Sequence, residues 1–166
     1  MDSFAREPVF FAYKTADSVI VQVKGYADYL SAPVLKGFLS DISVRNCNRF
    51  CFLFDECDGI DSTCLGLLAG LALRLKKLGG ICLFCGLKAR QLECIQMVGL
   101  DRLVYVIEST PVALTQTETT SVAVEPEEAR LTSQLVLEAH KFLMELNAKN
   151  KIKFQTVVSL LERFDR

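Results

Sequence analysis

The feature that most constrains the fold of this chain is an alternation between short apolar runs and segments with helical periodicity. Runs such as "RFCFLF", "ICLFC" and "RLVYVI" are rich in β-branched and aromatic residues, and segments with apolar residues every three or four positions separate them. Strands that alternate with helices form a largely parallel sheet, because each helix carries the chain back to the edge where the next strand begins.

Two runs at the start are joined only by a short polar connection, which predicts an antiparallel hairpin. The expected order is β-β-α-β-α-β-α-β. The strands are expected at residues 9–15, 18–25, 49–56, 81–87 and 102–108, and the helices at residues 31–42, 64–78 and 88–98. The sequence therefore predicts an α/β fold in residues 1–110, with a mixed sheet of about five strands flanked by helices.

The chain changes character after residue 110. Residues 111–125 are rich in Thr and Glu without a sustained period, which predicts a linker, with a short strand at "SVAV". Residues 126–166 contain no Gly, and Pro126 followed by Glu127 and Glu128 suits a helix N-terminus. We expect a C-terminal helical extension, formed by one long helix or by two helices joined near residues 147–151.

The extension carries two apolar stripes that need a covering surface. Three coverings are open: the sheet domain, the other stripe, or a second copy of the chain in a homodimer through residues 126–164. In a continuous coiled coil, Asn150 would lie on the seam as a register-setting polar residue. The expected stripes are Leu135, Ala139, Phe142 and Leu146, then Phe154, Val157, Leu161 and Phe164.

Composition excludes several classes of function. The formal net charge is −1 without clustered basic residues, so we expect no nucleic-acid partner. The N-terminus lacks a signal-peptide pattern, and the longest apolar run is interrupted by Arg74, so we expect a cytoplasmic protein without membrane contact.

The seven cysteines are scattered and odd in number, which indicates reduced thiols rather than a disulfide framework. Cys82 and Cys85 form a C-x-x-C pair, but on a strand two residues three apart point to opposite faces. Zinc and redox pairs need a turn or helix start at such a motif, so we expect buried thiols and no metal.

The stretch "GIDSTCLG", residues 59–66, follows a buried strand and opens a helix. Asp61 or Ser62 is a candidate N-cap, which stabilises a helix by about 1 kcal/mol. Alternatively, Ser62 accepts a phosphate, whose negative charge the helix N-terminus favours and neighbouring Asp61 opposes. These residues alone leave both interpretations open.

Catalytic constellations are not evident. His140, the only histidine, lies in the extension, which argues against Ser-His or Cys-His catalysis around Ser62 or Cys64. Carboxylates at positions 55, 56, 58 and 61 follow a strand, where Mg²⁺ often binds, but solvated loop carboxylates are the simpler interpretation. We expect no enzyme, no cofactor and no metal.

Three stretches, "GYADYLSA", "IDSTCLGLLAGLALRLKKLGG" and "CLFCGLKARQLECIQMVGLDRLVYV", resemble the STAS domain family in order and spacing from about residue 9 to 108. This family includes bacterial anti-sigma factor antagonists. The sequence departs from the family pattern at Cys64, where Gly is usual, and after the last strand, where the compact domain normally ends in a helix.

The resemblance implies a non-enzymatic regulator in a partner-switching pathway. Such a protein binds an anti-sigma factor that is a serine kinase and is phosphorylated on the hydroxyl after the Asp, which is Ser62, with Thr63 as second choice. A phosphatase reverses the modification. The implied partner-binding residues are Asp28, Asp61, Ser62, Thr63, Cys64 and Leu65. The alternative is an interaction module in which Ser62 only caps a helix and the extension forms oligomers.

Overall fold

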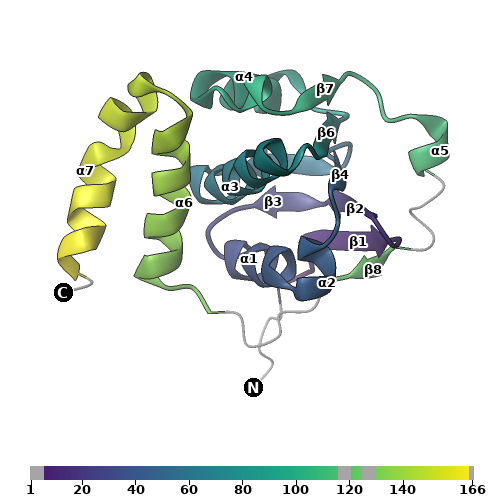
Figure 1. Ribbon diagram of the computed structural model, residues 1–166, viewed down its shortest axis with the longest axis horizontal. Coiled ribbons are helices and arrows are strands. Elements are labelled where there is room, and N and C mark those ends of the chain that lie inside the picture. The colour runs from purple at the N-terminus through teal and green to yellow at the C-terminus, as the bar shows by residue number, and fades with distance from the viewer. Residues whose placement is uncertain (1–5, 116–120, 125–129, 165–166) are drawn as a thin grey trace.

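The computed structural model describes residues 6–115, 121–124 and 130–164 and contains a six-stranded mixed sheet with the strand order β7-β6-β4-β2-β1-β8 (Figure 1). The opening hairpin is confirmed, since β1 pairs antiparallel with β2, whereas β2, β4, β6 and β7 are parallel. The strands of this sheet are β1 (Phe10–Lys14), β2 (Ser18–Val23), β4 (Arg49–Leu53), β6 (Ile81–Cys85), β7 (Tyr105–Ile107) and β8 (Val122–Ala123).

The expected order of strands and helices is also confirmed. Helix α1 (Ala32–Ser40) is followed by the short α2 (Ile42–Arg45), and α3 (Ser62–Leu78) and α4 (Ala89–Val98) end at left-handed glycines, Gly79 and Gly99. A 3-10 turn, η1 (Leu100–Arg102), and the short α5 (Val112–Thr115) were not anticipated. The expected strand at "SVAV" is present as β8, paired with β1 at the sheet edge.

The main core lies between one face of the sheet and helices α1, α3 and α4. Alternate residues of β2, β4 and β6 point into it, and the ring of Phe84 packs edge-to-face against the rings of Phe52 and Phe54. The other face carries a smaller cluster in which Cys51 Sγ lies 3.6 Å from Cys85 Sγ. Cys82 faces the main core, so the prediction that Cys82 and Cys85 point to opposite faces is confirmed.

A second, two-stranded parallel sheet of β3 (Gly25–Ala27) and β5 (Cys57–Ile60) was missed by the sequence analysis. These strands are only three and four residues long and each contains Gly, so neither produces a detectable apolar alternation. Their pairing brings the loop that precedes α1 against the start of α3.

The C-terminal extension forms two helices, α6 (Ser133–Leu146) and α7 (Ala148–Phe164), which lie side by side at one end of the molecule (Figure 1). Asn147 ends α6 and caps α7, because its Oδ1 accepts from Asn150 N at 2.8 Å. Asn150 Nδ2 donates to the carbonyls of Val98 and Leu143, both at 2.8 Å. Asn150 is therefore a buried tie between α7, α6 and α4 and not the seam residue of a coiled coil. The expected Pro126 start lies outside the described residues, and Thr132 caps α6.

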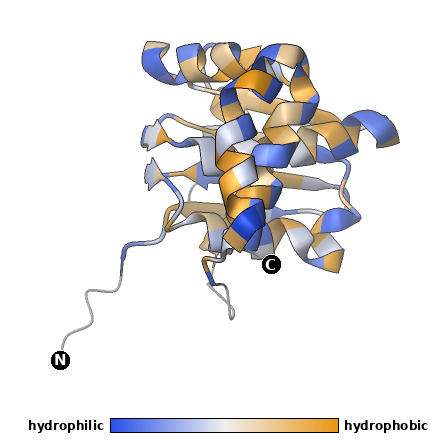
Figure 2. Ribbon diagram, turned by 90° about the vertical axis from the view of Figure 1, so that its left-hand side faces the viewer, coloured by the Kyte–Doolittle hydropathy of each residue, from blue (hydrophilic) through white to orange (hydrophobic). Residues whose placement is uncertain are grey.

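Helix α6 packs against α3 through the first predicted stripe, and α7 packs on α6. The second stripe is partly wrong. Phe154 and Val158 turn inward, whereas Val157 and Phe164 are exposed, so hydrophobic residues remain on the outer side of α7 (Figure 2). The helical hairpin of α6 and α7, residues 133–164, thus covers the sheet domain beside α3.

Candidate functional site

Asp61 is the N-cap of α3. Its Oδ1 accepts from the backbone N–H of Cys64 at 3.0 Å, and its Oδ2 accepts from Tyr29 N at 2.7 Å. One carboxylate therefore caps the helix and also fixes the loop before α1. Ser62 is the first residue inside the helix, and its hydroxyl takes no part in capping.

Asp28 lies in that same loop and is bound by the N-terminal segment. Arg6 donates from two guanidinium nitrogens to the two carboxylate oxygens of Asp28, at 2.7 and 2.8 Å. Hydrogen bonding to Arg6 and the attraction of its charge lower the pKa of Asp28 below its usual value, and backbone N–H donors from Ser31 and Leu30 add to this effect. Asp28 is thus an ionised group held beside the start of α3.

The other residues implied as partner-binding lie deeper. Thr63, Cys64 and Leu65 are buried in the first turns of α3. Burial raises the pKa of the Cys64 thiol far above its usual range, and its Sγ lies 3.3 Å from the Asp28 carbonyl. A buried thiol held in its neutral form is a packing residue, so Cys64 is not a reactive group in this arrangement.

Ser62 contacts His140, and the sequence analysis did not predict this contact. The Ser62 Oγ lies 3.1 Å from His140 Nε2, although 78 residues separate them. The Nδ1 of His140 lies 2.7 Å from the Val136 carbonyl, which can only accept, so Nδ1 carries the hydrogen and Nε2 accepts from the serine. The imidazole is 5% exposed, and its ring meets Phe154 edge-on at 5.5 Å.

This pair corresponds to two members of a catalytic triad, and it forms although His140 lies in the extension, the position that argued against Ser-His catalysis. The third member of a triad is absent among the described residues, because the imidazole Nδ1 faces a backbone carbonyl in place of a carboxylate. The pair therefore joins α6 to the start of α3 without the geometry of an activated nucleophile.

Helix α6 approaches α3 closely because two glycines face it. A Cβ atom at Gly66 would lie 2.1 Å from the Ala139 carbonyl oxygen, and one at Gly70 would lie 2.7 Å from the Phe142 ring. Because the atoms facing Gly66 are backbone atoms, only a residue without a side chain fits at that position. This close approach positions His140 over Ser62.

An exposed patch flanks the covered hydroxyl. Tyr26, Tyr29 and Leu30 are about half exposed or more, and the backbone of Tyr29 is bonded directly to Asp61. Exposed aromatic and aliphatic side chains next to a polar site are typical of protein-binding surfaces. The sequence analysis did not predict this patch, although its three residues lie close together in the stretch "YADYL", residues 26–30.

The carboxylates after β4 do not converge. Asp55 accepts from Thr110, Glu56 pairs with Lys24 at 3.2 Å, and Asp58 lies 3.9 Å from Lys88. In the described part of the chain, no three acidic, histidine or cysteine side chains gather as ligands for a metal ion. Nor, within those same ranges, is any helix both long and apolar enough to cross a bilayer.

A family model described as the STAS domain matches residues 11–117, which is more than half of the chain. The chain belongs to the STAS domain family. The matched region contains the capped start of α3 and ends before the helical hairpin. No curated protein sequence matches the chain significantly.

Solved structures with the same fold share little sequence with this STAS protein. The unphosphorylated anti-sigma factor antagonist SpoIIAA is 13% identical with a TM-score of 0.52, and covers 67% of this chain and 97% of its own. A putative anti-sigma factor antagonist from Thermotoga maritima is 17% identical with a TM-score of 0.55, and covers 67% and 94%. A sulfate transporter family protein from Wolinella succinogenes is 22% identical with a TM-score of 0.50, and covers 64% and 90%. These likenesses support the fold.

Proposed function

We propose that this STAS protein is a non-enzymatic regulator of a partner-switching pathway in the cytoplasm. It binds an anti-sigma factor that is also a serine kinase, and reversible phosphorylation of Ser62 controls that binding. The observation that carries the proposal is the division of roles at the start of α3, where Asp61 caps the helix and the Ser62 hydroxyl takes no part in capping. Solved STAS structures described as anti-sigma factor antagonists, one of them phosphorylated, support it.

The partner surface in this proposal is the edge beside Ser62. Tyr29 and Leu30 supply apolar contact area, and ionised Asp28 supplies a charged contact. A phosphate on Ser62 would add up to two negative charges next to the carboxylates of Asp28 and Asp61. This addition would make the partner-binding edge strongly negative. Partner release on phosphorylation follows from that change.

The helical hairpin adds a condition to this switch. The Ser62 hydroxyl is half-buried and faces His140, so a phosphoryl group added there would break this hydrogen bond and press against the imidazole. Movement of α6 away from the start of α3 would therefore favour phosphorylation. We infer that the hairpin protects Ser62 and that a kinase acts on the form in which α6 has separated.

A second candidate function is favoured by that same covering. If α6 never separates, Ser62 serves only as a hydrogen-bond donor to His140, and the exposed apolar side of α7 remains for self-association. The protein would then be a STAS interaction module that forms oligomers through residues 126–164 without phosphorylation.

The deciding experiment is intact mass measurement and phosphopeptide mapping of the protein isolated from its native host, in growing and in stressed cells. Phosphate on Ser62 that changes with growth condition supports the switch. A Ser62→Ala variant should lose this phosphate and retain the kinase partner, whereas Ser62→Asp should not retain it. Phosphate absent in every condition, together with unchanged partner binding by both variants, would contradict the switch and favour the interaction module.

A further inference from the structure

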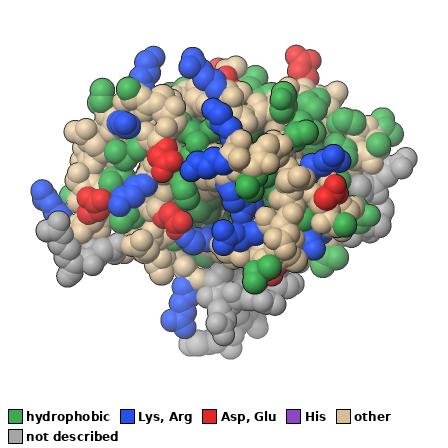
Figure 3. All heavy atoms as spheres, viewed as in Figure 1, with side chains coloured by type: hydrophobic (Ala, Val, Ile, Leu, Met, Phe, Trp, Pro, Cys, Tyr) green, Lys and Arg blue, Asp and Glu red, His purple; other side chains and the backbone are tan. Residues whose placement is uncertain are grey.

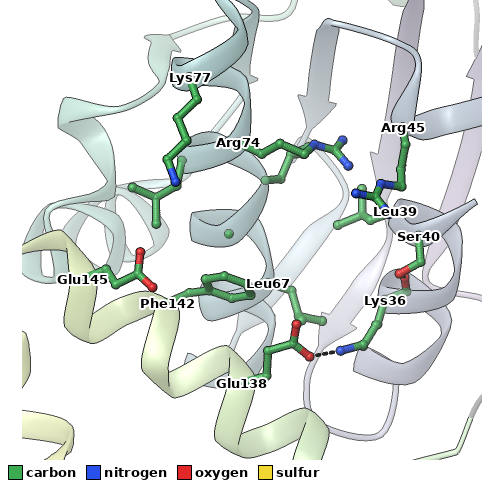
Figure 4. A pocket seen from close by; sticks show the side chains of 13 residues that line it. Lys36, Leu39, Ser40, Arg45, Leu67, Arg74, Lys77, Glu138, Phe142 and Glu145 are labelled. Carbon is green, nitrogen blue, oxygen red and sulfur yellow. Dashed lines mark hydrogen bonds and ion pairs between the residues drawn. The ribbon is translucent and has the colours of Figure 1, made fainter. Parts of the chain in front are cut away.

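A hollow of about 420 Å³ lies between α1, α2, α3 and α6, away from Ser62 (Figure 4). Its volume is in the range of small-molecule sites. Four basic side chains and two acidic ones line it, which leaves two net positive charges. They are Lys36, Arg45, Arg74, Lys77, Glu138 and Glu145. Lys and Arg side chains also gather over α3 on this face of the molecule (Figure 3).

The charges in this hollow are only partly balanced. Lys36 is paired with Glu138 across the gap between α1 and α6. None of the other three cations forms an ion pair with any described residue; these are Arg45, Arg74 and Lys77. Three cations thus line the hollow without a bound carboxylate; Arg45 and Arg74 face each other, and Lys77 points toward Glu145 (Figure 4).

Arg74 is the most informative of these cations. Its Nε and Nη2 atoms are shielded from solvent, and among the described residues neither has a hydrogen-bond acceptor. Burial, with repulsion from Arg45, lowers the pKa of this guanidinium. Figure 4 shows the two guanidinium groups directed toward the same space. An unpaired, partly buried guanidinium costs stability, and the charge of an anion bound beside it would offset part of that cost.

Apart from Ser40 and Gly70, the rest of the lining is apolar. Leu39, Leu67 and Leu71 contribute to the wall formed by α1 and α3, and the ring of Phe142 contributes from α6. An ordinary inorganic anion would contact little of this surface, whereas a molecule with an apolar body would bury it. The hollow therefore combines a cationic end with an apolar side.

We propose that this hollow binds a small amphipathic anion, with a phosphate-type dianionic head held by Arg45 and Arg74 and an apolar body against Leu39, Leu67 and Phe142. A dianion matches the two net positive charges of the lining. Arginine is suited to the head group because its planar fork of donors matches phosphate oxygens. The site goes beyond the proposed switch, since Arg74 lies toward the end of α3 opposite Ser62 and binding requires no modification of Ser62.

Binding is tested with octyl phosphate below its micelle-forming concentration, measured by isothermal titration calorimetry on the full chain. Inorganic phosphate supplies the head alone, and octanol supplies the body alone. We expect saturable one-to-one binding of octyl phosphate and weaker binding of both other probes. Equal binding of octanol would overturn the anionic assignment, and equal binding of inorganic phosphate would overturn the amphipathic one.

Variants locate the site. Arg74→Gln removes one charged contact and should weaken binding of octyl phosphate by about tenfold or more. Lys76→Gln is the matched control, because Lys76 is an exposed cation on the same helix that does not line the hollow. Arg45→Gln, at an exposed position, gives the same comparison if Arg74→Gln does not fold.

Glu145→Gln provides a test of sign. Removing this carboxylate from the lining should tighten binding of an anion, whereas a site for a cation would lose affinity. The proposal is overturned if octyl phosphate does not bind saturably, if Lys76→Gln weakens binding as much as the hollow variants, or if Glu145→Gln weakens it.

Discussion

At the scale of single residues, neighbouring side chains at the start of α3 have separate tasks. Asp61 accepts hydrogen bonds from backbone N–H groups of α3 and of the loop before α1. Ser62 donates to His140, which lies in α6 of the C-terminal hairpin. The motif therefore contains a helix cap, Asp61, and a separate hydroxyl, Ser62, which is bonded to His140.

The Ser62–His140 contact should be measurable as a coupling energy. Ser62→Ala, His140→Ala and the double variant form a cycle, and urea unfolding gives the free energy of each. We expect the two changes to be non-additive by about 0.5–1.5 kcal/mol, the usual net value of one hydrogen bond. Strict additivity would show that the two side chains do not interact in solution.

The Arg6–Asp28 pair predicts a pH-dependent contribution to stability. Because the folded-state pKa of Asp28 is lowered, the contribution is full above the unfolded pKa of about 3.9 and is lost as pH falls through the folded value. Arg6 is 40% exposed, so Arg6→Ala should cost about 1 kcal/mol or less at pH 7.

That cost should shrink below pH 4 when thermal unfolding is followed across pH. Arg49→Ala is the control, since Arg49 lies 3.8 Å from Asp17 in a more exposed pair. A cost for Arg6→Ala that is the same at pH 7 and at pH 3 would contradict the assignment.

At the scale of elements, the apolar surface of α3 explains why both the sheet and α6 pack against this helix. Its sequence is apolar on nearly every side, and ten of its residues are buried between the sheet and α6. A helix that is hydrophobic all round requires cover on both sides. The sequence "CLGLLAGLALRL" contained this signal, and the glycines within it mark the surface on which α6 rests.

Two glycine variants test this packing as a matched pair. Gly37→Ala, in an exposed position of α1 where an added Cβ meets nothing within 4 Å, should stabilise the protein by about 0.5–1 kcal/mol through helix propensity. Gly66→Ala should instead destabilise it by about 1–3 kcal/mol, because the new methyl group overlaps the Ala139 carbonyl.

Urea unfolding gives both values. Hydrogen exchange should also show faster exchange of the α6 amides in Gly66→Ala and unchanged exchange in Gly37→Ala. Similar stabilisation by both substitutions would mean that α6 does not pack on α3 as described.

At the scale of the whole molecule, the hairpin of α6 and α7 connects two properties. One side of it covers Ser62, and its outer side exposes hydrophobic residues of α7. Separation of the hairpin would uncover the hydroxyl and change the surface available for self-association together. Under the proposed switch, regulation and oligomeric state would therefore be coupled.

Self-association through α7 is testable by sedimentation. Val157, Leu160 and Phe164 are exposed and lie on one side of the helix. If a homodimer forms through this stripe, Leu160→Lys with Phe164→Lys should shift the protein to the monomer. Ile152→Lys, at an exposed position off the stripe, should not. A dimer that survives the double variant would place its interface elsewhere.

The sequence by itself determined the sheet, its hairpin, the order of its helices and the capped start of α3. These features depend on periodicities of two and 3.6 residues and on capping chemistry, which act within a few residues along the chain. The strands β3 and β5 were not predicted from the sequence because they are too short to show a periodic pattern.

Only the tertiary structure decided which surfaces meet. Periodicity shows that a helix has an apolar side and gives no partner for it, so the covering of α3 by α6, the contact of His140 with Ser62 and the cationic hollow were not predictable. Each joins residues far apart in the chain, and such contacts depend on the shape complementarity of packed elements. Here the complementarity depends on Gly66 and Gly70, whose lack of side chains leaves room for α6 to pack against α3.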